Sequence, residues 1–525
     1  MFRQIVVISI LAFGITTTQA ELAKRWVYCS FNLWVDKNVD ELEGIMRRAA
    51  SSGYNGILLS DSKFGKLGDM DAHYFRNIER VKRLAAELKL EIVPEVFPIG
   101  YSESLLWHDP NLAEGLPVRD ALFVVRDGLA HAVADPPVGF RAKWDWKDDG
   151  IVLEDGVARV TNPAGKNERL VQKFKVSPFR QYHISVRVKT ADFQGTPEVK
   201  VLAGGQALNY ANLGVKHTQD WTVHHAIFNS LTNSEVSVYF GCWDGKTGTL
   251  WWRDPQIEEA GLVNLIRRDG APFTVKHDNG SALIENRDFE PVIDPRMGTV
   301  PWKGAYEVWH NPPMIHVRNL SDGTRLRVSF YHAITVGDGQ VMICPSESKT
   351  VELLRDQARR MHAAWGAHGY FMAHDEIRVL NWDDSCTRRH LDAGGILADN
   401  VRTCAQILRG VNPGGDIYVW SDMFDPNHNA HSNYYLVRGD LAGAWNGLDK
   451  DVIIVDWYFA KREASLKWFA DNGNRQIIAG YYDAAPDQIR LWLAAAKQYP
   501  GILGVIYTTW QHKFADLERF ADFIQ

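Results

Sequence analysis

The chain has 525 residues, of which 46% are apolar and 23% charged, and its formal net charge is −6. This length exceeds one ordinary core, so we expect two or three domains. The basic residues are scattered along the chain, which argues against nucleic acid as the main partner. The 19 Trp and 18 Tyr residues supply flat faces that suit sugar rings, although aromatic residues also fill cores.

The first 20 residues have the pattern of a secretory signal peptide. Arg3 provides a basic start, residues 5–15 are mainly apolar, and Thr18-Gln19-Ala20 forms a small-residue cleavage site. The apolar stretch is too short to span a membrane comfortably. We therefore expect cleavage after Ala20 and a secreted or periplasmic protein with no integral membrane segment. A retained membrane anchor is the alternative.

The five cysteines are an odd number and have no CxxC spacing. This pattern predicts neither a disulfide framework nor a zinc site, and we expect the thiols to be buried as small apolar groups. We therefore expect no cofactor and no catalytic metal. The residues concerned are Cys29, Cys242, Cys344, Cys386 and Cys404.

The N-terminal part alternates strand-like and helix-like segments. Residues 26–31, 56–61 and 91–98 are predicted strands. A predicted helix between the first two begins at Asn38, with Glu41 in capping-box spacing, and stops near Gly53. A second helix covers residues 75–88, since its apolar residues recur at helical spacing. This alternation indicates a parallel sheet.

The pattern changes to period-two alternation near residue 134. "QYHISVRVKT" and "EVSVYFGCW" place apolar residues on one face and polar residues on the other, which predicts antiparallel strands. We interpret residues 134–262 as an inserted, jelly-roll-like β-sandwich and residues 263–345 as a β-rich connecting region. Within that region, Asp322-Gly323 between two alternating runs predicts a hairpin.

Helix-strand alternation resumes after the β-rich region and continues to the C-terminus. Five further strands are predicted, at residues 369–376, 416–424, 451–459, 475–483 and 504–511. Eight strands with helices between them predict a (β/α)₈ TIM barrel, with a first part at 21–133 and a second part at 346–525. An open doubly wound sheet is the alternative, and the missing glycine-rich loop after the first strand disfavours it.

The predicted strand ends hold the candidate site residues, because barrel chemistry lies where strands end. Six of the eight ends carry an acid and four carry a Trp, which suits a sugar-cleaving cleft. The candidates are Asp61, His374, Asp375, Glu376, Trp420, Asp422, Asp456, Trp457, Tyr458, Tyr481, Tyr482 and Trp510.

The adjacent acids Asp375 and Glu376 are the strongest candidates for catalysis. Neighbouring residues in a regular strand point to opposite faces, so both can face one pocket only if the strand breaks there. The alternative is one buried acid that hydrogen-bonds a loop and one surface acid. A metal site at His374 is weakly indicated, because a single His accompanies the two acids.

The Asp-Glu pair after the fourth strand resembles that of family 20 glycoside hydrolases, the β-N-acetylhexosaminidases. The lead-in here is Phe-Met-Ala-His-Asp-Glu where that family has His-x-Gly-Gly-Asp-Glu, and the last strand gives Trp510-Gln511-His512. The resemblance implies a substrate-assisted retaining mechanism, in which the acetamido oxygen of the sugar attacks the anomeric carbon. The departures indicate a distant relative with altered specificity.

The resemblance also implies roles for individual residues. Asp375 would orient the acetamido group, and Glu376 would be the general acid/base. The pocket wall would be formed by Trp420, Trp457 and Trp510, with Tyr481 or Tyr482 bonding the acetamido oxygen. The inserted sandwich resembles a carbohydrate-binding module. Its candidate stacking residues are Trp144, Trp146, Trp221, Trp243, Trp251 and Trp252.

Together these observations predict a glycoside hydrolase that binds an oligo- or polysaccharide. One alternative is ordinary two-carboxylate hydrolysis, with Glu376 as acid and Asp422 or Asp456 as base or nucleophile. Another is a non-catalytic glycan-binding protein on a barrel scaffold. A serine hydrolase is disfavoured because no Gly-x-Ser-x-Gly elbow stands out.

Overall fold

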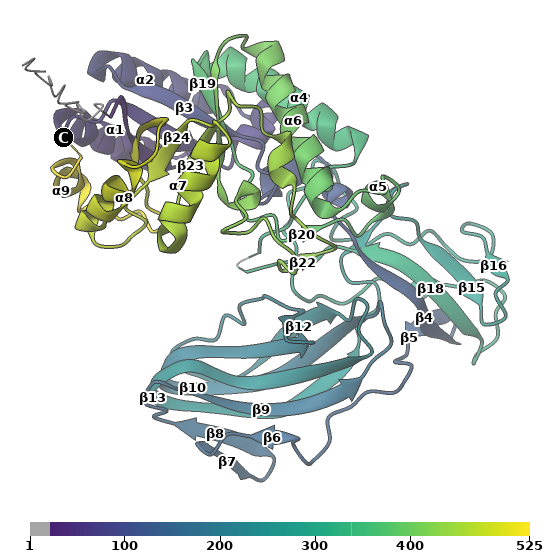
Figure 1. The fold of residues 1–525 in the computed structure, drawn as a ribbon. Helices are drawn as coiled ribbons and strands as arrows, with labels where there is room; N and C mark the ends of the chain where they lie inside the picture. Colours follow the sequence, from purple (N-terminus) through teal and green to yellow (C-terminus); the bar gives the residue numbers. More distant parts are fainter. Residues whose placement is uncertain (1–21, 338, 525) are drawn as a thin grey trace, which may run out of the picture.

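The computed structural model describes residues 22–337 and 339–524, so the expected signal peptide lies outside the described residues. Eight parallel strands close into a barrel (Figure 1). In spatial order these are β1 (Lys24–Ser30), β2 (Gly56–Ser60), β3 (Glu91–Val96), β19 (Gly369–Met372), β21 (Asp416–Trp420), β23 (Ile453–Asp456), β24 (Gln476–Ala479) and β25 (Ile502–Tyr507). The predicted division into three strands before the β-rich region and five after it is confirmed.

The longer helices between these strands pack against the outside of the barrel (Figure 1). The longer ones are α1 (Asp36–Ser51), α2 (Ala72–Leu88), α4 (Ser348–Trp365), α6 (Ala393–Val411), α7 (Arg462–Asp471) and α8 (Ile489–Ala496), and the short ones are α3 (Glu103–Leu106), α5 (Asp384–Thr387) and α9 (Leu517–Ala521). The capping box predicted at Asn38 is wrong, because α1 starts earlier and has Val35 as its N-cap. The Asn38 amide instead donates to the carbonyl of Asn32, at 3.3 Å.

Side chains fill the inside of the barrel. Along β1, Trp26 and Tyr28 point inward, whereas Val27 and Cys29 face the helices, as the two-residue period of a strand requires. Trp26 meets Tyr418 edge to face, with ring centroids 5.0 Å apart. The interior is therefore a packed core, and open space is left only above it, where the strands end.

The inserted region contains an eight-stranded antiparallel sheet that folds into two layers. Its strands are β6 (Trp146–Lys147), β7 (Ile151–Glu154), β8 (Val157–Thr161), β9 (Lys166–Lys175), β10 (Gln181–Ala203), β11 (Gln206–Ala207), β12 (Gln219–Asn229) and β13 (Glu235–Glu259). Phe240 and Trp252, from the two halves of β13, face each other with ring centroids 5.8 Å apart. Antiparallel sheets are present in the inserted region, and their interpretation as a jelly-roll-like sandwich stays a prediction.

The long strands β10 and β13 turn the corner between the layers together. Their register shifts between Ala191 and Thr196, where the ladder changes direction. Gly248 lies at this corner with φ of +81°, and a Cβ there would be 2.1 Å from the carbonyl oxygen of Asp192. Only glycine fits such a close approach of two backbones.

A second antiparallel sheet joins the sandwich to the barrel (Figure 1). It contains β4 (Leu116–Arg126), β5 (Leu129–Ala132), β14 (Leu265–Ile266), β15 (Thr274–His277), β16 (Ala282–Leu283), β17 (Ile315–His316) and β18 (Arg325–His332). The expected first part of the barrel, 21–133, includes β4 and β5, but these pair with β18 and β17. The antiparallel part of the chain thus begins near Leu116 and not at residue 134.

The hairpin predicted at Asp322-Gly323 is wrong. The two strands that flank this turn, β17 and β18, do not pair, because β5 and β4 lie between them in the sheet. Gly323 has φ of +81° and donates its N–H to the carbonyl of Val125 at 2.9 Å. Residues 322 and 323 do form a turn, but this turn hydrogen-bonds to the β4–β5 hairpin and does not join two paired strands.

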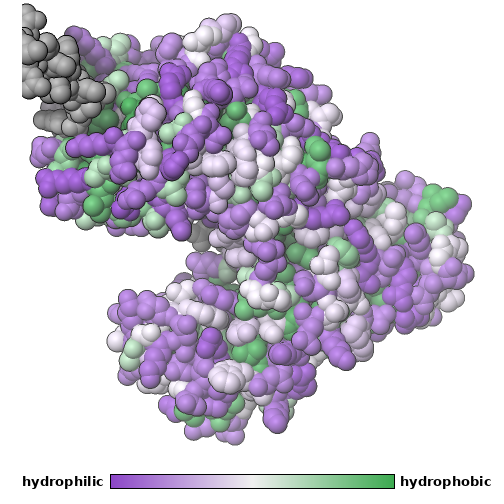
Figure 2. Space-filling model, viewed as in Figure 1, coloured by the Kyte–Doolittle hydropathy of each residue, from purple (hydrophilic) through white to green (hydrophobic). Residues whose placement is uncertain are grey.

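The surface drawn in Figure 2 is mostly hydrophilic, and its strongly hydrophobic residues are scattered in small groups. Two short parallel strands, β20 (Val379–Leu380) and β22 (Leu436–Val437), connect loops of the barrel. Among the described residues, no helix is both long and apolar enough to cross a membrane.

The role of β4 predicts how fragments of the insertion behave. Val118, Phe123 and Val125 on β4 are buried in the core of the second sheet. A fragment of residues 116–334 should therefore unfold cooperatively, whereas a fragment of 134–334 should melt at least several degrees lower or aggregate. Circular dichroism and thermal unfolding measure this, and equal melting temperatures would contradict the assignment of β4.

Candidate active site

A cavity of about 460 Å³ lies where the barrel strands end, and residues at or near the ends of all eight strands line it. Its polar floor includes Glu95, Asp375 and Glu376, and its walls are largely aromatic. Lining residues that the sequence analysis also selected are Asp61, Asp375, Glu376, Trp420, Trp457, Tyr482 and Trp510. The structure thus brings seven of the twelve predicted residues into one cavity.

The strand break that lets Asp375 and Glu376 share this cavity is visible in the backbone. β19 ends at Met372, and Glu376 has φ of +47°, in the left-handed region that residues other than glycine seldom adopt. The bend presses the carbonyl of Asp375 against Gly100, where a Cβ would lie 2.0 Å from the carbonyl oxygen. Gly100 is therefore required for the turn that aims both carboxyl groups at the cavity.

The carboxyl group of Glu376 is held by two donors. The Tyr101 hydroxyl donates a short hydrogen bond to Oε2, and the Arg378 guanidinium forms an ion pair with the same oxygen at 2.6 Å. The Glu376 side chain keeps 25% of its surface exposed, so a ligand can reach it. Arg378 donates a 2.5 Å hydrogen bond to Gln340 Oε1, which fixes the guanidinium. The side-chain amide of Gln340 in turn donates to the Glu376 carbonyl at 2.9 Å.

Asp375 lies next to Glu376 on the floor of the cavity. Burial raises the pKa of Asp375 well above its usual range, because a carboxylate loses hydration there. The neighbouring carboxyl groups of Asp422, Glu95 and Glu376 raise this pKa further by charge repulsion. Asp375 is therefore a carboxyl group that holds its proton more strongly than an exposed aspartic acid.

Glu95 is a cavity residue that is not among the twelve predicted site residues. It is level with Phe371 of β19, and its Oε1 accepts a hydrogen bond from Trp420 Nε1 at 3.4 Å. Burial raises the pKa of Glu95, and hydrogen bonds from Ser60 and Trp420 oppose this shift. Its position in the third strand was the available signal.

Asp422 supports the site from behind. It is fully buried, and its Oδ2 accepts hydrogen bonds from the Glu376 N–H at 2.8 Å and from the Asn429 side chain at 3.0 Å. Trp457 Nε1 lies 3.4 Å from Oδ1. Burial is the main cause that raises the pKa of Asp422 to about 7. Asp422 thus holds the strained backbone of Glu376.

The aromatic residues form a continuous wall. Trp457 stacks on Tyr482, with ring centroids 5.3 Å apart and planes 8° apart. Trp510 contacts Tyr482, Trp420 and Tyr28, with centroids 6.0, 5.6 and 5.0 Å away. Trp510 and Tyr482 are 40% and 39% exposed, so their rings are open to a ligand. Such faces can stack on a sugar ring.

Three predicted residues, besides Asp422 and Asp456, lie outside the cavity. His374 is buried behind it and contacts Asn400 at 3.0 Å, and burial lowers the pKa of His374 to about 4. Tyr481 donates to Asp516 at 2.9 Å, which leaves Tyr482 as the tyrosine of the wall. Tyr458 stacks on His428, with ring centroids 4.1 Å apart.

Two of the predicted acids, Asp456 and Asp61, have surroundings that suit a structural role. Asp456 is fully buried, and burial raises its pKa well above the usual range. It does not line the cavity, so it is unsuitable as the catalytic base suggested by its strand end. Asp61 lines the cavity but accepts hydrogen bonds from Leu33, Lys63 and Tyr74 at 2.9, 2.9 and 2.7 Å, so it anchors loops.

The sequence analysis did not select Tyr28, Tyr101 and Arg378. Tyr28 lies inside β1, while Tyr101 and Arg378 lie in loops, so no strand end marks them. The sandwich also reaches this region, since Tyr210 contacts Tyr435 with centroids 4.3 Å apart, and Tyr435 lies under Arg378 at 5.0 Å. The inserted domain is therefore connected to Glu376 through two aromatic rings and one guanidinium.

Comparisons with known proteins return weak structural likenesses only. No protein-family model and no curated protein sequence matches the chain. A family 20 β-N-acetylglucosaminidase is 11% identical over 96% of this chain and 69% of its own, with a TM-score of 0.38. A rhamnosidase from Novosphingobium sp. PP1Y is 12% identical over 93% of this chain, with a TM-score of 0.32, and this chain spans 55% of its length.

The inserted region has a separate likeness. A family 4 carbohydrate-binding module is 19% identical over 22% of this chain and 77% of its own, with a TM-score of 0.18. Likeness at these scores establishes neither a family nor an activity, so the function has to be argued from the site.

The raised pKa of Asp422 predicts a pH-dependent stability. An unfolded aspartic acid ionises near pH 4, whereas Asp422 in the folded protein ionises near pH 7. Between these values only the unfolded state loses its proton, so this group makes the fold less stable as pH rises, until the effect levels off above 7. Asp422→Asn removes this loss.

The measurement is urea unfolding of the wild type and Asp422→Asn at pH 4.5 and 7.5. The difference in unfolding free energy should shift in favour of the variant by about 1 to 3 kcal/mol at the higher pH. A difference that is the same at both pH values would show that Asp422 is ionised in the folded protein.

Proposed function

We propose that this protein is a glycoside hydrolase. The observation that supports the proposal is the shared cavity, in which the Asp375 and Glu376 side chains lie against Trp420, Trp457 and Trp510. Glycosidic bond cleavage requires a proton donor and a second carboxyl group beside a surface that holds the sugar ring. The cavity at the ends of the barrel strands contains both.

Glu376 is the proposed general acid/base. Its side chain is partly exposed, and both fixed contacts are made to Oε2, which leaves Oε1 for the glycosidic oxygen. Tyr101 and Arg378 restrict the side chain to one orientation, and Asp422 fixes the backbone behind it. Such positioning lowers the activation free energy, because the carboxyl group is already oriented when it donates its proton.

We propose a 2-acetamido sugar as the substrate and Asp375 as the residue that assists it. When the acetamido oxygen attacks the anomeric carbon, the N–H of the acetamido group becomes strongly acidic. A carboxylate with a raised pKa is a strong base, so Asp375 can take up or hold that proton and fix the acetamido group. Tyr482 and the three tryptophans would enclose the acetamido group, and Tyr482, one of the two tyrosines expected in this role, would be its hydroxyl partner.

A second candidate is two-carboxylate hydrolysis of a sugar without an acetamido group. Glu95 favours this reading, because it lines the same cavity on the neighbouring strand and would serve as base or nucleophile. Asp422 is occupied by the backbone of Glu376, and Asp456 lies outside the cavity, so neither fills that role. Carboxyl groups about 5 Å apart give retention and 6.5 to 9.5 Å give inversion, as a rough rule.

We further propose that the protein is exported and that the sandwich binds glycan. Export is supported by the signal pattern of residues 1–20. Among the candidate tryptophans of the sandwich, Trp146 is 59% exposed, whereas Trp252 is 4% exposed and belongs to the core. Trp146 is therefore the best stacking residue of the sandwich. If the barrel has no activity on any glycoside, the protein is a glycan-binding protein.

Glu376→Gln tests the proposed acid. The amide keeps the shape of the side chain but cannot deliver a proton, so kcat on aryl glycosides of N-acetylglucosamine should fall by about 10² to 10⁴. Asp456→Asn is the matched control, since this acid ends barrel strand β23 but lies outside the cavity, and it should stay within about threefold of the wild type. Near-normal kcat for Glu376→Gln would remove it from the mechanism.

Asp375→Asn separates the two mechanisms. In the substrate-assisted reaction, the variant should lose kcat by about 10² or more with a small change in KM, because Asp375 acts on the charge that develops in the transition state. The wild type should also bind a thiazoline mimic of the intermediate far more tightly than substrate.

The substrate-assisted proposal fails if the wild type cleaves aryl glycosides without an acetamido group equally well. In that case Glu95→Ala should be inactive on these glycosides and azide should restore turnover, which would identify Glu95 as the nucleophile. Azide restores nothing in Glu95→Ala if Asp375 and the substrate itself perform the reaction.

A further inference from the structure

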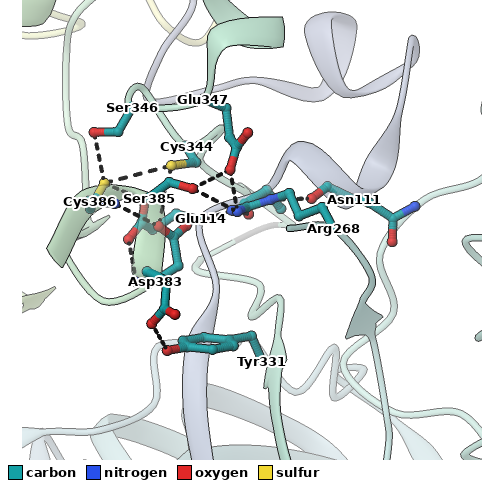
Figure 3. A network of polar contacts seen from close by, with 12 residues as sticks. Asn111, Glu114, Arg268, Tyr331, Cys344, Ser346, Glu347, Asp383, Ser385 and Cys386 are labelled. Carbon is teal, nitrogen blue, oxygen red and sulfur yellow. Dashed lines mark hydrogen bonds and ion pairs between the residues drawn. The ribbon is translucent and has the colours of Figure 1, made fainter. Parts of the chain in front are cut away.

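Four buried side chains meet where the inserted region leaves and rejoins the barrel. They are Glu114, Cys344, Asp383 and Cys386, and one ligand atom from each lies within 4.8 Å of the others. Figure 3 shows the sulfur atoms of the two cysteines facing each other, with Ser346 on one side and Arg268 reaching in from the other. None of these groups lines the cavity of the proposed sugar site.

The distances within this cluster resemble the edges of a tetrahedron. The two sulfurs are 3.6 Å apart, Cys344 Sγ is 3.5 Å from Asp383 Oδ1, and Cys386 Sγ is 3.3 Å from Glu114 Oε2. Around a tetrahedral Zn²⁺ with Zn–S of about 2.3 Å and Zn–O of about 2.1 Å, simple geometry gives S···S of about 3.8 Å and S···O of about 3.6 Å. These three distances are within a few tenths of an ångström of those values.

We propose that Glu114, Cys344, Asp383 and Cys386 bind one structural Zn²⁺ ion. Thiolate and carboxylate ligands in a closed tetrahedral set suit this ion, whereas Ca²⁺ and Mg²⁺ require more oxygen ligands and avoid thiolates. All four positions come from protein side chains, which is the composition of a structural site. The sequence rule for zinc missed it, because the ligands do not form CxxC pairs.

Neighbouring donors already orient the ligands. The N–H of Trp382 donates to Glu114 Oε1 at 2.7 Å, and Arg268 contacts Asp383 Oδ2 at 2.5 Å. Glu114 is thus fixed through Oε1 and turns Oε2 toward Cys386, while Asp383 Oδ1, which faces Cys344, also accepts the Cys386 N–H at 3.0 Å. Metal sites generally have such outer contacts, which hold ligands in place before the ion binds.

The charge balance also favours an ion. Of the two buried carboxyl groups, Asp383 pairs with Arg268 at 2.5 Å, and the same guanidinium also pairs with Glu347 at 2.6 Å. Glu114 and Asp383 are both buried and their carboxyl groups face the same pair of sulfurs, so the pair is costly as it stands. Zn²⁺ would replace the two thiol protons, which pass to solvent, so the net charge of the cluster stays the same while each carboxylate gains a cation.

A disulfide between Cys344 and Cys386 is the competing use of these residues. It would draw the sulfurs together and leave Glu114 Oε2 and Asp383 Oδ1 facing a group with no proton to donate, at a cost in buried polar contacts. The placement of two carboxylate oxygens against the sulfurs therefore favours the metal.

Zinc here would fasten three distant parts of the chain. Glu114 comes before β4, Cys344 follows the insertion, and Asp383 with Cys386 belongs to the loop that begins at the catalytic strand β19. Within that loop, Trp382 lies four residues beyond Arg378, the partner of Glu376. The ion would hold the base of the insertion and the loop of the proposed site in one arrangement.

Metal analysis of the intact protein tests this proposal. Protein expressed in zinc-supplemented medium and dialysed against metal-free buffer should retain about one Zn²⁺ per chain. Replacement with Co²⁺ should give the visible bands of a tetrahedral site and a thiolate charge-transfer band in the near ultraviolet. Removing the ion should lower Tm by at least about 5 °C, and Zn²⁺ should restore it.

Cys386→Ser and Cys404→Ser form the matched pair of variants. Both residues are buried, but Cys404 lies on α6, away from the cluster. Zinc content should fall at least tenfold in Cys386→Ser and stay unchanged in Cys404→Ser. If Cys386→Ser does not fold, the cobalt spectrum of the wild type still decides. A Cys344–Cys386 disulfide in peptide maps, or free thiols with no bound zinc, would overturn the proposal.

Discussion

The hydrogen bond from the Glu376 N–H to Asp422 Oδ2 is the contact on which the candidate site depends. It stabilises a left-handed backbone at a residue with a side chain, a conformation that costs about 1 kcal/mol or more. The fully buried carboxyl group of Asp422, whose other side-chain contacts are with Asn429 and Trp457, offsets this cost. Without this bend Asp375 and Glu376 would point to opposite sides of the strand, and only one of them could reach the cavity.

The same bend concentrates carboxyl groups in a space with little water. Burial raises the pKa values of Asp375, Asp422 and Glu95, and repulsion by neighbouring carboxylates raises those of Asp375 and Asp422 further. Glu376 is the fourth acid here, and it is the one that Arg378 and Tyr101 contact. The acids of the cavity therefore have different electrostatic surroundings, which is the usual physical basis for different roles of chemically similar groups.

The sequence was sufficient for the periodic parts of the fold and for residues at strand ends. All eight barrel strands follow from apolar runs, and Asp375, Glu376, Trp420, Trp457 and Trp510 meet as their positions predict. Features that arise from tertiary contact could not be predicted. Tyr101 and Arg378 reach Glu376 from loops, β4 leaves the barrel for a sheet formed 200 residues later, and His374 and Asp456 turn away because their neighbours in the strand turn inward.

The close approach of the two ends of the insertion has a consequence for how the chain folds. Phe371 pairs with Glu95, although the chain between them is long, and Ala113 bridges Ile343 at the base of the insertion. Closing so long a loop directly is entropically expensive and slow. If the insertion folds first, its ends emerge side by side and the effective loop shortens to residues 96–112 and 344–370. The antiparallel domains are then a folding scaffold that allows β3 to find β19 and the barrel to close.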